Sequence, residues 1–129
     1  MRRTVGVTLM VLLLLSFAAP AQAAVSAVGI DYAICNGPCA DGNGITSFTG
    51  FITCTNGEIY TIRANMRQGG ETIAVGRASG TCTGSSQNWT TNRVDNPGSL
   101  DCNAAFNVGG KATSQTGGKR IPNTQFFCF

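Results

Sequence analysis

The sequence predicts an all-β protein: an antiparallel β-sandwich of about seven short strands, preceded by a cleaved signal peptide. Three observations predict this class. Apolar and polar residues alternate with period two in several segments, and turns rich in Gly, Asn and Pro separate these segments. After the apolar leader, no segment has the periodicity of a helix. Six cysteines in a small exported domain indicate a disulfide framework. A small barrel is the alternative architecture.

The first 23 residues have the features of a secretory signal peptide. Arg2 and Arg3 form a positive n-region, Val7–Ala19 is apolar, and Ala21-Gln22-Ala23 is a small-x-small cleavage site. A retained membrane anchor is the alternative, but the apolar run is short for a span of about 20 residues. We therefore predict a secreted, extracellular protein whose mature chain, Ala24–Phe129, is a single domain free of the membrane.

Signal cleavage changes the charge of the protein. The full chain has nine Lys and Arg against six Asp and Glu. Removing Arg2 and Arg3 leaves seven basic residues against six acidic ones, a net charge of +1. The sequence shows no concentrated basic footprint of the kind that nucleic-acid binders carry, so no nucleic-acid partner is predicted.

The first strand is predicted at Val25–Ile34. The apolar residues at its alternate positions, which should share the buried face, are Val28, Ile30, Tyr32 and Ile34. The following residues, 35–44, are dense in Gly, Asn and Pro and are predicted to form a loop. A calcium site there is disfavoured because an isoleucine stands where the third oxygen ligand is expected.

A central hairpin is predicted from Phe48–Thr55 and Glu58–Arg67, because Asn56-Gly57 between two β-prone runs is a strong hairpin signal. A three-residue loop is preferred to a two-residue loop, since it pairs Ile52 with Tyr60 and so matches the apolar faces. Gly57 would then occupy the left-handed position that glycine adopts freely.

The same criteria place the remaining strands at Glu71–Thr81, Gln87–Val94, Leu100–Val108, Lys111–Gln115 and Thr124–Phe129. Leu100–Val108 has the cleanest alternation in the chain, which predicts a half-buried strand. The rest of the glycine-rich segment 109–123 is expected to be a mobile loop.

The sequence contains few residues that are suited to catalysis. The chain has no His, the commonest general base. The even number of cysteines predicts pairing and leaves no free thiolate. Zinc is disfavoured because Cys35 and Cys39 are the only closely spaced pair. We therefore predict a protein that is not an enzyme and that holds no cofactor or metal.

One group of motifs resembles a pattern found in small exported proteins of actinobacteria. These motifs are Gly50-Phe-Ile-Thr-Cys54, Gln68-Gly69, Gly76-Arg77, Thr81-Cys82-Thr83-Gly84 and Gln87-x-Trp89. The proteins that they resemble are immunoglobulin-like β-sandwich domains of uncharacterised function. The resemblance implies an immunoglobulin-like sandwich, a Cys54–Cys82 bridge and no known activity.

Sequence alone does not select one connectivity for six cysteines. We predict local nesting, with the pairs Cys35–Cys39, Cys54–Cys82 and Cys102–Cys128. Cys54 shares the core side of its strand with Ile52, and Cys82 ends the following strand region. Cys102 lies on the apolar face of its predicted strand, where Cys128 could tie the terminal strand beside it.

Three functional classes remain after catalysis is set aside. The first is a secreted binding or cell-surface module with an unknown protein or glycan ligand. The second is a protease inhibitor that presents Lys119-Arg120-Ile121-Pro122 or the Cys35–Cys39 loop as a rigid substrate-like segment. The third is an antimicrobial protein, which disulfides would suit.

Trp89 is the residue on which a glycan-binding site would depend. It is the only Trp, and it lies among amides and hydroxyls, where an exposed ring could stack on a sugar. Gln87, Thr91 and Arg93 would add hydrogen bonds from the same strand face. The alternative, which we favour, is that Trp89 fills the sandwich core.

Overall fold

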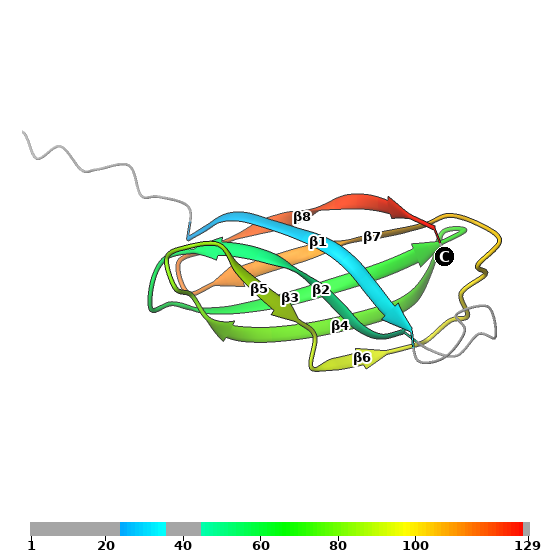
Figure 1. Cartoon of the computed structure of the whole chain (residues 1–129), viewed down its shortest axis with the longest axis horizontal. Coiled ribbons are helices and arrows are strands. Elements are labelled where there is room, and N and C mark those ends of the chain that lie inside the picture. Colours follow the sequence, from blue (N-terminus) through cyan, green and yellow to red (C-terminus); the bar gives the residue numbers. More distant parts are fainter. Residues whose placement is uncertain (1–23, 36–44, 128–129) are drawn as a thin grey trace, which may run out of the picture.

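The computed structural model describes residues 24–35 and 45–127 of the chain. These residues form eight strands in two antiparallel sheets that pack face to face (Figure 1). The predicted all-β sandwich is confirmed, with eight strands in place of about seven. No helix that could cross a membrane occurs in this part of the chain. The predicted signal peptide and the predicted loop at 36–44 lie outside the described residues.

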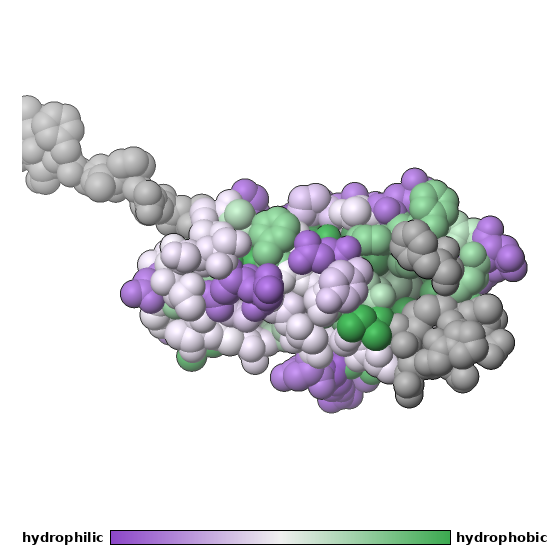
Figure 2. Space-filling view, viewed as in Figure 1, coloured by the Kyte–Doolittle hydropathy of each residue, from purple (hydrophilic) through white to green (hydrophobic). Residues whose placement is uncertain are grey.

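The strands are β1 (Val25–Cys35), β2 (Ile45–Cys54), β3 (Ile59–Gln68), β4 (Glu71–Thr81), β5 (Gln87–Thr90), β6 (Arg93–Asp95), β7 (Phe106–Ser114) and β8 (Gly117–Phe126). The three-stranded sheet has the order β1-β2-β5, and the five-stranded sheet has the order β6-β4-β3-β7-β8. Figure 2 views the molecule from the side of the three-stranded sheet, where hydrophobic and hydrophilic patches are interspersed.

The predicted central hairpin is wrong, because β2 and β3 belong to different sheets and do not pair. A turn joins them, in which the Glu58 N–H donates to the Thr55 carbonyl at 3.1 Å. Gly57 has a φ of 83°, as expected, but Asn56 does not have a positive φ. Asn56 and Gly57 are the central residues of this four-residue turn, and a turn in which only the second central residue has a positive φ splays its flanking strands. The chain therefore crosses from one sheet to the other at Asn56-Gly57.

A tight hairpin of the five-stranded sheet instead joins β3 to β4. Gly69 and Gly70 have φ values of 56° and 83°, and Gln68 pairs with Glu71 across them. Two successive left-handed residues match the twist of paired strands. The glycine pair thus sets the register between β3, which precedes the turn, and β4, which follows it.

A bulge in β1 reverses the predicted exposure of its second half. Val28 and Ile30 are buried as expected, but Tyr32 is 54% exposed and Ile34 is also exposed. Ile30 pairs with Gly50 and Tyr32 pairs with the adjacent Thr49, so one residue of β1 has no partner. One extra residue sends every later side chain to the opposite face.

The predicted strand at Leu100–Val108 is wrong over its first six residues, which form a loop before β7 begins at Phe106. The Gln68 side chain binds this loop: its Oε1 accepts from the Asp101 N–H at 2.8 Å, and its Nε2 donates to the Asp101 carbonyl at 2.7 Å. The Asp101 carboxylate also accepts from the Asn103 N–H at 2.9 Å. Local bonds of this kind compete with a strand ladder for the backbone groups.

The strand predicted at Lys111–Gln115 is confirmed as far as Ser114, whereas the mobile loop predicted for the rest of the glycine-rich segment after Val108 is corrected, because it is strand on both sides of the turn at Gln115-Thr116. β7 continues to Ser114, and β8 already begins at Gly117, well before the predicted final strand. Gly110 lies in β7 with a φ of 155°, and a Cβ there would collide with the Arg63 carbonyl of β3. Glycine at this position therefore serves close strand approach, not chain flexibility.

The core fills the space between the two sheets. Its largest fully buried side chains include Trp89, Phe48, Ile52, Met66 and Val108. Burial also raises the pKa of the Tyr60 phenol. A disulfide adds a covalent link to the core at one end of the sandwich.

The Cys54–Cys82 disulfide is confirmed. It joins the last residue of β2 to the residue after β4, and so ties the two sheets together. Cys102 is also disulfide-bonded. The pairs Cys35–Cys39 and Cys102–Cys128 stay predictions, because Cys39 and Cys128 lie outside the described residues.

Candidate functional site

Trp89 belongs to the core, as favoured, and not to an exposed binding platform. The residue is 2% exposed, and its indole N–H donates to the Phe51 carbonyl at 3.0 Å. The ring packs over Gly50, where a Cβ would lie 2.7 Å from a ring carbon. Since stacking on a sugar requires an accessible ring face, Trp89 is not available for that role.

The other predicted binding residues are dispersed by the fold. Gln87 bridges the turn before β5, accepting from the Thr83 N–H at 2.8 Å and donating to the Thr81 carbonyl at 2.9 Å. Thr91 is buried, and its Oγ1 accepts from the Phe48 N–H at 2.8 Å. The predicted strand Gln87–Val94 is in fact two strands, because the chain leaves the three-stranded sheet after β5 and enters the five-stranded sheet at β6. Arg93 is therefore separated from the others.

Arg93 instead belongs to a row of cations that crosses the five-stranded sheet. Arg93 of β6 pairs with Arg77 of β4, and Arg77 pairs with Arg63 of β3. On the other side, Arg63 pairs with Lys111 of β7, which pairs with Arg120 of β8. All five residues are exposed. We call Arg93, Arg77, Arg63, Lys111 and Arg120 the cation row.

Strand alternation explains why this row faces outward. In β3, Ile62 and Ala64 point into the core, so Arg63 between them points to solvent. Residues directly opposite one another in a sheet share a face, so the partners of Arg63 lie on the same side. With strands about 4.8 Å apart, five successive strands give the row a length of about 19 Å.

Most of the positive charge in the row has no acidic partner. Among the described residues, the one ion pair joins Arg93 to Asp95 at 3.2 Å. Like charges directly opposite each other destabilise a sheet. The row therefore works against the stability of the fold.

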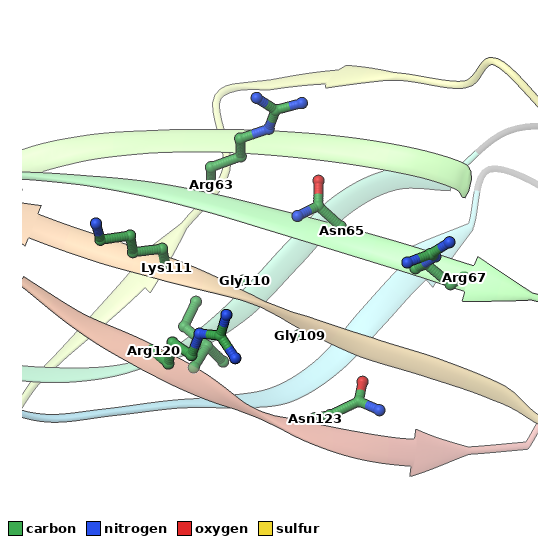
Figure 3. A pocket seen from close by; sticks show the side chains of 9 residues that line it. Arg63, Asn65, Arg67, Gly109, Gly110, Lys111, Arg120 and Asn123 are labelled. Carbon is green, nitrogen blue, oxygen red and sulfur yellow. The ribbon is translucent and has the colours of Figure 1, made fainter. Parts of the chain in front are cut away.

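Three open grooves lie along this face, and Arg63 lines all of them. The first has a volume of about 460 Å³ and is bounded by Arg63, Arg67, Lys111 and Arg120. Figure 3 shows these side chains around Gly109 and Gly110, where the strand is bare backbone. The second, of about 410 Å³, lies along β4, β3 and β7, and the third, of about 510 Å³, reaches Asp95.

The polar residues that line the grooves are cations, hydroxyls and amides, and apolar residues such as Ile62 and Val94 lie among them. Among the described residues, the basic ones are Arg63, Arg67, Arg77, Lys111 and Arg120, the one acidic residue is Asp95, and none is aromatic. The Thr61 and Thr113 hydroxyls hydrogen-bond each other at 2.7 Å beside the cation row. Exposed guanidinium and ammonium groups in this setting can bind carboxylate, sulfate or phosphate.

Sequence reasoning missed this site. The expectation that the chain lacks a concentrated basic footprint is wrong, because strand pairing gathers cations that stand well apart in the sequence. The outward-facing set of β3, which contains Arg63 and Arg67, was the one available signal. It does not show which residues lie opposite on neighbouring strands.

The segment considered for protease inhibition does not protrude from the fold. Lys119–Pro122 lies inside β8, where Arg120 pairs with Lys111 and Ile121 is 4% exposed. An inhibitory segment must fit extended into a protease cleft, which these paired residues do not offer. The Cys35–Cys39 loop lies outside the described residues.

Comparisons of the chain with protein-family models, curated proteins and solved structures found no match. The geometry of the face is therefore the basis for a functional proposal.

Proposed function

We propose that this protein is an exported, non-catalytic binding module that holds anionic ligands on the outer face of its five-stranded sheet. The single observation that carries the proposal is the register that aligns Arg93, Arg77, Arg63, Lys111 and Arg120. Such a module would act in solution outside the cell or at the cell surface.

The free-energy balance of the row supports a binding role. Adjacent cations repel each other in the unbound protein, and this repulsion is weakened only by solvent and salt. An anion placed along the row removes the repulsion and adds charge-assisted hydrogen bonds. Because the cations are held on paired strands, little backbone ordering is needed when the ligand binds.

The predicted first residue of the exported chain, Ala24, is part of the packed fold. Ala24, which follows the predicted cleavage site, is 1% exposed, and its carbonyl accepts from the Thr55 N–H at 2.9 Å. The Cys54–Cys82 bridge suits an oxidising compartment. The intact mass of the exported protein should correspond to a chain that starts at Ala24. A mass that still includes Arg2 and Arg3 would contradict cleavage.

The binding proposal is tested with surfaces coated with polygalacturonate, polyphosphate or polyglutamate, with polylysine as the counter-control. The oxidised mature protein should bind the polyanions at low salt and release them at high salt. Lys111→Gln should weaken this binding more than Lys119→Gln, although both remove one charge. Lys119 is the matched control because it lies opposite Ala112, outside the row, and its Nζ donates to the Ser26 carbonyl at 2.8 Å.

Failure to bind any of the three polyanions would overturn the proposal. Equal losses in the Lys111→Gln and Lys119→Gln variants would also overturn it, because the effect would then follow net charge and not the cation row.

A further inference from the structure

We infer that the ligand is an acidic polysaccharide that lies across the strands, along the cation row. The inference rests on the proposed anion-binding function and assigns its ligand class. Three features of the face carry it: the length and direction of the row, the polar groups beside it, and the glycine backbone at Gly109 and Gly110.

The row suits a linear chain of repeated negative charges. It presents one cation per strand, at intervals of about 4.8 Å, over about 19 Å. A single small anion would occupy one interval and leave the remaining cations unpaired. A polymer that carries a charge on successive monomers can satisfy neighbouring cations together. Four of the five cations are Arg, whose fork-shaped guanidinium binds carboxylate and sulfate oxygens in pairs.

The groups that flank the row suit sugar hydroxyls. Thr61, Ser79 and Thr113 line the groove on one side. The Thr61–Thr113 hydrogen bond uses only one of the two hydroxyl protons, so the pair can still donate to and accept from a ligand. On the other side, Asn65 and Asn123 line the groove around Gly109 and Gly110.

The bare backbone at Gly109 and Gly110, which we call the glycine floor, lets a ligand come close to the sheet. A Cβ at Gly109 would lie 3.2 Å from the Asn123 side-chain oxygen and would stand in the groove. With glycine there, the bulk of a sugar ring can rest on backbone while its acidic group reaches Arg63, Lys111 or Arg120. The glycine floor therefore favours a ligand that has the bulk of a sugar ring as well as negative charge.

Nucleic acid fits this face less well. Proteins that bind single strands stack bases on aromatic side chains, and none of the described residues that line the three grooves is aromatic. The major groove of duplex DNA, about 12 Å wide, admits a helix or a two-stranded ribbon, whereas this face is a sheet about 19 Å across. Contact would then be limited to phosphates.

The test compares ligands that separate charge from sugar chemistry. The oxidised mature protein is titrated calorimetrically with oligogalacturonates of increasing length, and with polyphosphate, polyglutamate and oligo(dT) of matched charge. Neutral galactan is the uncharged control. Affinity for oligogalacturonate should rise with length until the row is covered, and then level off. At matched charge, the longest oligogalacturonate should bind more tightly than the three other polyanions.

Two variants assign the contacts. Lys111→Gln should weaken binding of oligogalacturonate and of polyphosphate alike. The double variant Thr61→Val, Thr113→Val keeps the branched shape but removes both hydroxyls. It should weaken oligogalacturonate binding by about threefold or more, as expected for lost neutral hydrogen bonds. It should weaken polyphosphate binding by a smaller factor, because phosphate oxygens only accept hydrogen bonds whereas sugar hydroxyls both donate and accept them. Emission from buried Trp89 verifies that each variant is folded.

The outcomes distinguish this inference from the proposed function. If polyphosphate and oligogalacturonate bind equally and the double Thr variant affects both to the same extent, the face is a general anion site and the polysaccharide assignment is overturned. Preference for oligo(dT) or polyglutamate would also overturn it, in favour of nucleic acid or acidic protein. Binding to none of the polyanions would overturn the proposed function as well.

Discussion

Arg63 and Arg77 lie directly opposite each other on β3 and β4, with both side chains exposed on the outer face of the five-stranded sheet. Lys111 stands on the other side of Arg63. Three adjacent cations therefore occupy the centre of the sheet, and none of them has an ion-pair partner among the described residues. Their mutual repulsion links the stability of the fold to the occupancy of the face.

Replacing Arg63 should affect stability and binding in opposite directions. Arg63→Gln should raise the free energy of unfolding at low salt by about 0.2–1 kcal/mol, the usual size of a cross-strand pair effect, while it weakens polyanion binding. Added salt should stabilise the wild type more than this variant, because salt screens the repulsion that the variant lacks. Urea unfolding at low and high salt measures both effects.

Lys119→Gln is the control for that experiment, since it changes the net charge without touching the row. It should not show the stabilisation. Loss of stability in Arg63→Gln at low salt would show that repulsion within the row is not significant.

Trp89 should behave as a core residue. Its emission should be blue-shifted and resistant to acrylamide, because the ring is buried against Gly50 and its N–H is hydrogen-bonded to Phe51. Trp89→Ala should lower the free energy of unfolding by about 3–5 kcal/mol, the usual cost of a large-to-small change in a core. Chemical denaturation provides the measurement. Red-shifted emission that responds directly to added glycan would contradict burial.

The Cys54–Cys82 bridge should make a large contribution to stability. It joins residues separated by 28 positions and connects the two sheets. In the loop-entropy estimate, closing a loop of this size stabilises the fold by about 3–4 kcal/mol. The double variant Cys54→Ala, Cys82→Ala should lose this amount in denaturant unfolding. A loss below about 1 kcal/mol would show that packing alone holds the sheets together.

Glu58 should add a pH-dependent increment to stability. The Thr116 hydroxyl donates to one carboxylate oxygen at 2.6 Å and the Ser114 hydroxyl to the other at 2.7 Å, and these bonds lower the Glu58 pKa from 4.5. A lowered pKa in the folded state means that the contribution is fully present above pH 4.5 and is lost as the pH falls through the folded value.

The measurement compares wild type with Glu58→Gln in urea, from neutral pH to below 4.5. The wild type should be the more stable protein at neutral pH, and the difference should shrink on acidification. A difference that stays constant over this range would show that the carboxylate charge is not involved.

Local patterns were enough to identify several features of this protein. The period-two alternation within β3 is enough to assign Tyr60 and Ile62 to the buried face and Arg63 to the outer face. The left-handed Gly57 was also predicted correctly. These features depend on a residue and its near neighbours, because side chains alternate across any strand and only glycine adopts left-handed backbone without cost.

Pairing between distant segments is a property of the folded chain, and here local patterns misled. Asn56-Gly57 suggested a hairpin, yet the turn there leads the chain into the other sheet, where β3 pairs with β4 and β7. The cation row depends most strongly on tertiary structure: Arg63 and Lys111 are 48 residues apart by their numbers and become neighbours only through the pairing of β3 with β7. A shift of one residue in that register would turn one of them away from the face. The residues of the site are thus visible in the sequence, but their alignment arises from long-range strand pairing.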